Sequence, residues 1–124
     1  MTIAIIGASA DRRKFGNKAV RAWLRAGETV VPINPKGGEI EGLPVVKSVL
    51  DYEGEIDTAS VYLPPQLALA VLDELAEKKI PEVFINPGAE SEALIERAKE
   101  LGINAMLAYS IIGAGSRPGD FGDE

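Results

Sequence analysis

The chain contains no cysteine and no histidine among its 124 residues. Without cysteine it can form no disulfide, thiolate metal site or cysteine nucleophile, which fits a reducing compartment. Without histidine it lacks the commonest general base, so Ser-His-Asp triads, phosphohistidine chemistry and histidine-ligated metals are excluded. These two absences remove most of the common enzyme mechanisms.

Long apolar runs are also missing. No stretch approaches the roughly 18 consecutive apolar residues that a membrane span needs, and Met1–Ile6 contains no basic segment ahead of a long apolar one. Apolar residues nevertheless make up 46% of the chain, which is enough to bury a core at this length. We therefore expect one cytoplasmic domain with no membrane partner.

The net charge of −6 is unevenly distributed. Residues 1–47 carry eight Lys and Arg against four Asp and Glu, whereas residues 48–124 carry five against fifteen. An acidic chain with only a local positive cluster lacks the broad basic face that nucleic acid requires, so we expect no nucleic-acid partner. The basic half could hold an anionic ligand, and chance segregation of surface charge explains the pattern equally well.

Five apolar runs rich in β-branched residues are typical of parallel strands that are buried on both faces. These runs are Ile3–Gly7, Thr29–Ile33, Ala59–Leu63, Glu82–Asn86 and Ile103–Leu107. Because helix-like segments alternate with them, residues 1–112 are predicted to form a Rossmann-like α/β domain. Its doubly wound five-stranded parallel sheet has the order 3-2-1-4-5 in a three-layer α/β/α arrangement. Residues 113–124 are polar and glycine-rich, which predicts a flexible C-terminal tail.

Helix signals lie between the apolar runs. Pro64 and Pro65 can open a helix, because the missing N–H costs nothing there. Ser91 and Gly102 suit the start and the end of another helix. Between the second and third runs the pattern weakens to a glycine-rich loop, a short extended piece at Leu43–Val46 and one helical turn. Leu67, Val71 and Leu75 are expected to line one face of the helix after Pro65.

The turn after the first run is the first candidate site. Open α/β sheets bind ligands beyond the carboxyl ends of their strands, where the strand order reverses, and the helix N-terminus that follows favours anions. The turn combines glycine, a hydroxyl group and cations that could cradle a diphosphate. The residues concerned are Gly7, Ala8, Ser9, Arg12, Arg13 and Lys14. The alternative is a tight turn with a capping serine and solvated bases.

The segment after the second run is the second candidate site. NAD sites usually place Asp or Glu here to bind the adenosine ribose, but this chain has Asn34 followed by Pro35 and Lys36. An acid would repel a phosphate on the ribose, whereas an amide and a cation favour one. Both the 3′-phosphate of coenzyme A (CoA) and the 2′-phosphate of NADP meet this requirement. An ordinary solvated loop lysine is the other interpretation.

Four motifs occur in a recognisable order between residue 3 and about residue 108. They are Gly7-Ala8-Ser9, the segment Val31–Val45, Val61–Pro65, and Asn86-Pro87-Gly88. Together they resemble the small CoA-binding proteins, whose fold is that of the N-terminal CoA-binding domain in the α subunit of succinyl-CoA synthetase.

The resemblance implies a role for each motif. Gly7–Ser9 would meet the diphosphate, and Asn34 and Lys36 would meet the ribose and its phosphate. Leu63–Pro64 would flank the adenine or the diphosphate, and the pantetheine arm would run along Asn86–Gly88. Prolines and glycine that merely form loops after buried strands are the alternative for the last two motifs.

These observations predict a module that binds CoA or an acyl-CoA and has no chemistry of its own. No acid, base or thiol completes a catalytic set, and the acidic run Asp51–Asp57 suits a solvated link better than a metal site. Ser110 stands where members of the family often carry a cysteine. The alternatives are an NADP-dependent oxidoreductase, a nucleotide-binding subunit that needs a partner, and an interaction protein with a vestigial pocket. A homo-oligomer or a protein partner stays open.

Overall fold

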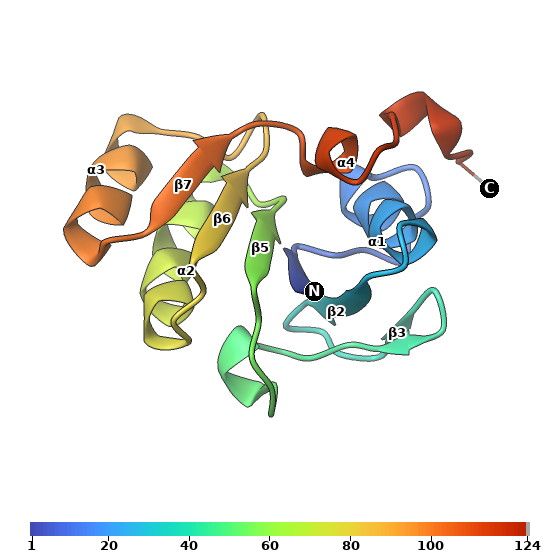
Figure 1. The fold of residues 1–124 in the computed structure, drawn as a ribbon, viewed down its shortest axis with the longest axis horizontal. Coiled ribbons are helices and arrows are strands. Elements are labelled where there is room, and N and C mark those ends of the chain that lie inside the picture. The colour runs from blue at the N-terminus through green and yellow to red at the C-terminus, as the bar shows by residue number, and fades with distance from the viewer. Residues whose placement is uncertain (124) are drawn as a thin grey trace.

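Five parallel strands form one sheet with helices on both faces, as the computed structural model shows for residues 1–123, apart from the side chain of residue 118 (Figure 1). The strands are β1 (Thr2–Ile6), β2 (Thr29–Ile33), β5 (Thr58–Val61), β6 (Glu82–Ile85) and β7 (Asn104–Leu107). The main helices are α1 (Phe15–Arg25), α2 (Pro65–Glu77), α3 (Glu92–Leu101) and the short α4 (Ser110–Gly113). The predicted Rossmann-like α/β fold with a five-stranded parallel sheet is confirmed.

The strand order across the sheet is β2-β1-β5-β6-β7. Outside β2, Val46 forms a parallel bridge with Ile33. When this bridged piece is counted as the third strand in the chain, the order across the sheet reads 3-2-1-4-5-6, which begins with the expected order and adds β7 at the far edge. When only the five strands of the sheet are counted, their order is 2-1-3-4-5. The direction of winding changes between β1 and β5, so their carboxyl ends form the switch point of the sheet.

The core lies on both faces of the sheet, which explains why the strands are continuous apolar runs. Ile3 and Ile5 of β1 belong to the cluster under α1 and α4, whereas Ala4 and Ile6 belong to the cluster under α2 and α3. All four side chains are at most 2% exposed. Full burial of each isoleucine contributes about 1.5 to 3 kcal/mol to the stability of the fold. Because the central strand is held firmly in this way, the turn that follows it has a fixed position.

The helix ends follow the local signals. Ser91 caps α3, its Oγ accepting a hydrogen bond from the Leu94 N–H at 3.1 Å. Gly102 ends that helix with a φ of 71°. Leu67, Val71 and Leu75 share one face of α2 as expected, but that face is not buried along its whole length, since Leu67 is 56% exposed. It lies in the first turn of α2, at the carboxyl edge of the sheet, and borders a surface cavity there. The buried face of α2 consists of Ala68, Leu72 and Leu75.

The segment between β2 and β5 forms the antiparallel pair β3 (Glu39–Ile40) and β4 (Leu43–Pro44), followed by the 3-10 turn η1 (Val49–Asp51). The extended piece and the helical turn expected there are both present. None of the helices within residues 1–123 is long and apolar enough to cross a membrane.

The described part of the C-terminal tail contacts α1. It contains the short 3-10 turn η2 (Pro118–Asp120). Phe121 is 9% exposed, with the Arg21 guanidinium 5.5 Å from the centre of its ring. The same guanidinium donates a hydrogen bond to the carbonyl oxygen of Gly122 at 2.8 Å. The flexibility expected of the tail stays a prediction.

Candidate functional site

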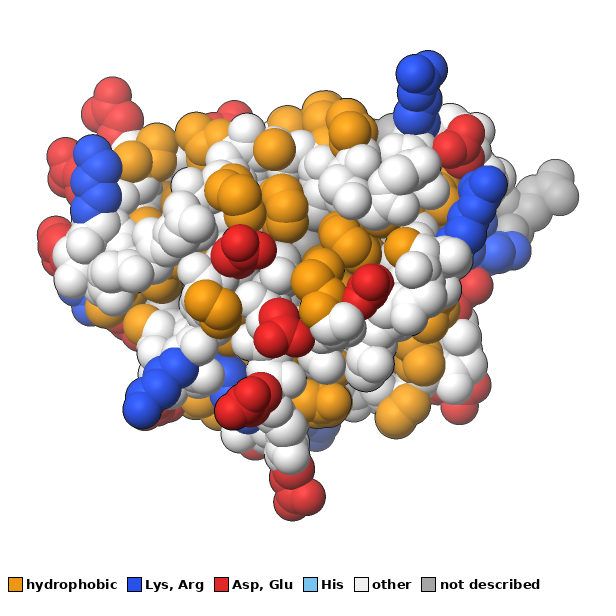
Figure 2. Space-filling model, in the orientation of Figure 1, with side chains coloured by type: hydrophobic (Ala, Val, Ile, Leu, Met, Phe, Trp, Pro, Cys, Tyr) orange, Lys and Arg blue, Asp and Glu red, His pale blue; other side chains and the backbone are white. Residues whose placement is uncertain are grey.

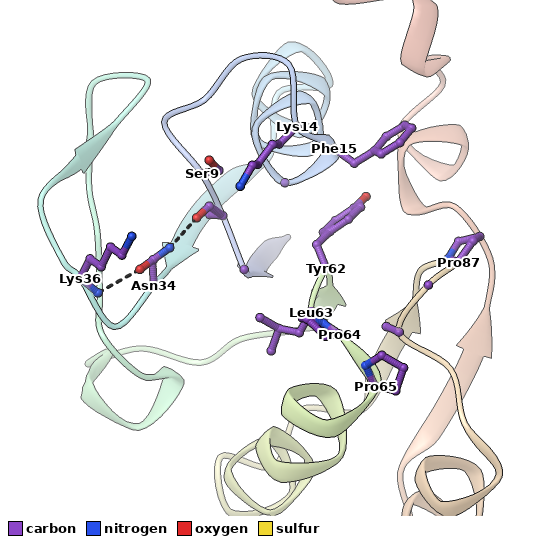
Figure 3. A pocket seen from close by; sticks show the side chains of 15 residues that line it. Ser9, Lys14, Phe15, Asn34, Lys36, Tyr62, Leu63, Pro64, Pro65 and Pro87 are labelled. Carbon is purple, nitrogen blue, oxygen red and sulfur yellow. Dashed lines mark hydrogen bonds between the residues drawn. The ribbon is translucent and has the colours of Figure 1, made fainter.

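A cavity of about 600 Å³ opens at the switch point. Its walls come from the turn after β1, the start of α1, the loop after β2, the β5–α2 junction and the loop after β6 (Figure 3). It is lined by Gly7, Ala8, Ser9, Lys14, Phe15, Gly16, Asn34, Lys36, Tyr62, Leu63, Pro64, Pro65, Pro87, Gly88 and Ala89. The fold therefore brings together all the residues expected at the site except Arg12, Arg13 and Asn86.

The turn after β1 depends on two glycines. Gly7 has a φ of 86°, and a Cβ atom there would overlap the carbonyl oxygen of Tyr62 at the end of β5. A Cβ atom on Gly16 would overlap the carbonyl oxygen of Gly7. The absence of both side chains lets β1, β5 and the first turn of α1 approach one another. The result is a cavity floor of backbone at a helix N-terminus, an arrangement that favours an anion.

Ser9 and Asn34 use their side chains to shape the two loops. The Ser9 Oγ accepts a hydrogen bond from the Asp11 N–H at 3.0 Å. The Asn34 Nδ2 donates to the carbonyl oxygen of Ala8 at 2.9 Å, and its Oδ1 accepts from the Lys36 N–H at 2.9 Å (Figure 3). Asn34 thereby joins the turn after β1 to the loop that carries Lys36.

Two lysines supply the positive charge of the cavity wall. Lys14 comes from the residue before α1 and Lys36 from the loop after β2, and both side chains are exposed. Figure 3 shows them on either side of Asn34. A phosphorylated ligand in this part of the cavity would be close to two cations and to the N-terminus of α1, each of which favours negative charge.

The two arginines expected at the turn lie outside the cavity walls, because each has an acidic partner nearby. The Arg13 guanidinium donates to both carboxylate oxygens of Asp11, at 3.0 and 2.9 Å. These hydrogen bonds from the Arg13 side chain, followed by one from its backbone, lower the pKa of Asp11 to about 2. The Arg12 Nε lies 3.5 Å from a carboxylate oxygen of Glu41, on the loop between β3 and β4.

The opposite wall of the cavity is apolar. It consists of Leu63 and Pro64 at the β5–α2 junction, Pro87 after β6, and the rings of Tyr62 and Phe15 (Figure 3). Burial raises the pKa of the Tyr62 phenol above its ordinary value of 10.0, so this side chain is neutral near pH 7. A cationic wall facing an apolar wall suits an elongated ligand that has both phosphate groups and apolar groups.

Asn86 precedes the lining residue Pro87 but does not itself line the cavity, and it is 2% exposed. Its Nδ2 donates to the Ser60 Oγ at 2.8 Å and to the Val61 carbonyl oxygen at 3.0 Å, and its Oδ1 accepts from the Ser110 N–H at 3.0 Å. It therefore holds the ends of β5 and β6 against the start of α4. A buried amide that satisfies these groups positions the loop after β6, and Asn86 is not among the residues that line the cavity.

Five lining residues were missed by the sequence reasoning, namely Phe15, Gly16, Tyr62, Pro65 and Ala89. Gly16 carried a usable signal, since glycine is a poor residue for the first turn of a helix unless another backbone approaches closely. Phe15 and Tyr62 carried none, because an aromatic residue next to a strand or helix is usually part of the core.

The fold and the site together define a class, that of Rossmann-like α/β domains with a glycine turn, a helix N-terminus and a cavity at the switch point. The sequence pattern of the CoA binding domain family matches residues 1–116. The chain therefore belongs to this family, and the resemblance seen in its motifs is confirmed.

Several curated proteins are similar to the chain. It is 33% identical over 97 residues to ADP-forming acetate–CoA ligase I of Archaeoglobus fulgidus, a match that covers 78% of the chain and 14% of the ligase. It is 32% identical, over an alignment of 128 positions, to subunit alpha of ADP-forming acetate–CoA ligase I of Pyrococcus furiosus. This match covers 90% of the chain and 28% of that subunit. The chain thus spans less than a third of the length of these relatives.

Solved structures share the fold. A conserved hypothetical protein from Pyrococcus furiosus matches with a TM-score of 0.80 and 33% identity, over 85% of this chain and 90% of that one. The dinucleotide-forming acetyl-CoA synthetase 1 of Ca. Korarchaeum cryptofilum, in complex with phosphate and ADP, matches with a TM-score of 0.77 and 29% identity. That match covers 87% of this chain and 25% of the synthetase. The same domain is therefore found both in proteins of similar size and as a part of larger enzymes.

Proposed function

We propose that the chain binds CoA or an acyl-CoA in the cavity at the switch point and has no chemistry of its own. Lys36 and the backbone around Asn34 would meet the ribose and its 3′-phosphate. Gly7–Ser9 and the N-terminus of α1 would meet the diphosphate. Leu63–Pro64 would flank the adenine or the diphosphate, and the pantetheine arm would run along Pro87–Gly88.

The observation that carries the proposal is the order of these groups along the edge of the sheet. The carboxyl ends of β2, β1, β5 and β6 follow one another across the sheet. A ligand lying along this edge meets Lys36 first, then the turn after β1, then Leu63–Pro64, and last Pro87. Three strand spacings extend over roughly 14 Å, so only an elongated ligand reaches all four. CoA has its phosphorylated ribose, diphosphate and arm in that order.

Calorimetry with CoA, acetyl-CoA, NADP and ATP tests the proposal. CoA is expected to bind more tightly than NADP and ATP, because only CoA has both the ribose phosphate and the long arm. Binding of CoA no tighter than that of NADP or ATP would overturn the proposal. Hydride transfer by the isolated chain would instead support an NADP-dependent oxidoreductase.

A nucleotide-binding subunit that needs a partner is the second candidate. It is favoured by the relatives, since the chain matches 14% of one ADP-forming ligase and 28% of a ligase subunit named alpha. Affinity purification followed by native mass spectrometry separates the two candidates. A stable complex with a second protein that adds catalytic activity supports the subunit, and a CoA-loaded chain with no such partner supports the module.

A further inference from the structure

A second cavity, of about 670 Å³, lies next to α4 and the segment after it. It is lined by Phe15, Tyr109, Ile112, Gly115, Ser116 and Arg117. Phe15 lines both this cavity and the one at the switch point. The second cavity therefore adjoins the apolar wall of the first.

Three large apolar side chains of this second cavity are exposed. Phe15 is 47% exposed, Tyr109 is 41% exposed and Ile112 is 61% exposed. The rings of Phe15 and Tyr109 lie 6.2 Å apart between centroids, so residues from two distant parts of the chain form one surface. In Figure 2, hydrophobic side chains gather at the upper edge of the molecule, where Figure 1 places α4. A cluster of this kind on a small domain marks a binding surface.

The surface at α4 is held in place by hydrogen bonds to polar side chains next to the first cavity. The backbone N–H of Ser110 donates to Asn86, and the Ser110 Oγ lies 2.6 Å from the Ser60 Oγ and 3.0 Å from the Tyr62 hydroxyl. Ser110 and Ile111 are both fully buried. The helix therefore packs through these two residues, and Tyr109 and Ile112 on either side of them stay outside. A surface anchored in this way is formed before any ligand binds.

The proposed direction of CoA in the first cavity connects the first cavity with the second. With the ribose phosphate at Lys36 and the arm along Pro87, the thiol end lies at the end of the first cavity that is away from β2, where Figure 3 also shows Phe15. Phe15 begins α1, and α4 packs against α1 (Figure 1). We infer that the second cavity binds the aliphatic acyl chain of an acyl-CoA, against Phe15, Tyr109 and Ile112. This inference rests on the proposed function and adds a ligand class to it, since free CoA would leave the apolar surface uncovered.

The test is a calorimetric series of CoA, acetyl-, butyryl-, hexanoyl- and octanoyl-CoA with the full chain. Each buried methylene should tighten binding by about threefold to fourfold until the cavity is filled. Affinities that do not change from CoA to octanoyl-CoA would overturn the inference and leave the proposed function intact. If CoA itself does not bind, the proposed function fails, and the acyl site fails with it.

The variant Ile112→Ser tests whether the acyl chains of these ligands bind in the second cavity. This side chain is 61% exposed, so its replacement should not disturb folding. The variant should lose about tenfold more affinity for hexanoyl-CoA than for CoA. Leu107→Ser is the matched control, because Leu107 is 56% exposed but lies outside the lining of the second cavity. An equal loss in both variants would show that the chain length is sensed elsewhere and would overturn the assignment.

Discussion

The backbone of Gly16 packs directly against the carbonyl oxygen of Gly7, with no room for a Cβ atom between them. This contact seats the N-terminus of α1 on the turn after β1. The position of the helix amides relative to the cavity therefore depends on a residue that touches no ligand through a side chain.

Gly16→Ala should lower the free energy of unfolding by about 1 to 3 kcal/mol, the usual cost of forcing an extra methyl group into a packed site. It should also weaken CoA binding, because α1 must move away from the turn. Urea unfolding and calorimetry measure the two effects. The control is Gly119→Ala, where a Cβ atom meets nothing within 4 Å and the change should stay within about 0.5 kcal/mol. Equal stabilities of the two variants would contradict the role given to Gly16.

Lys36→Glu should weaken the binding of CoA about 10- to 100-fold, because a charge-assisted hydrogen bond contributes roughly 1.5 to 3 kcal/mol. Binding of dephospho-CoA should change much less, because that ligand lacks the 3′-phosphate. The measurement is the ratio of the two dissociation constants in the wild type and the variant. Lys99→Glu, on the exposed face of α3, is the control for net charge. Equal losses for both ligands would place Lys36 at another part of the ligand.

The basic residues of the turn after β1 should differ in their effect on binding. Lys14 lines the cavity, whereas Arg13 is bound to Asp11 and lies outside it. Lys14→Gln should therefore weaken CoA binding about tenfold, and Arg13→Gln should change it by less than about threefold, since only the first removes a cation that can reach a phosphate. Both substitutions remove one positive charge, so each is the control of the other. A larger loss for Arg13→Gln would reverse the assignment.

The pair formed by Asp11 and Arg13 predicts a pH dependence at the turn. Its hydrogen bonds lower the pKa of Asp11 from 3.8 to about 2. A carboxyl group whose pKa is lowered by folding stabilises the folded state above its ordinary pKa, and this contribution is lost as the pH falls from 3.8 toward 2. The titration of the Asp11 carboxyl carbon, followed by NMR, should have its midpoint near 2 in the wild type. In Arg13→Gln the midpoint should return toward 3.8. A wild-type midpoint already at 3.8 would refute the pairing.

Much of the fold was predictable because its signals are local. The apolar runs around β1, β2 and β5 indicated strands buried on both faces, and Ser91 and Gly102 indicated the ends of α3. The spacing of Leu67, Val71 and Leu75 indicated one face of α2 but not the exposure of Leu67, since apolar spacing alone does not show where a helix begins to overlap the sheet. Gly7–Ser9 and Lys36 line one cavity, as the topology of such sheets leads one to expect, and their contact with a ligand stays a prediction.

By itself, the sequence determined the strands, the helices, the glycine turn and the lack of thiol and imidazole groups, because these depend on residue type and on spacing along the chain. Only the tertiary structure decided that Lys14 lines the cavity while Arg13 pairs with Asp11, and that Phe15 meets Tyr109. It also decided that Asn86 is buried against Ser60 and Ser110. Those outcomes depend on competition between partners in three dimensions. A side chain binds whichever group the fold brings within reach, and spacing along the chain does not say which group that is.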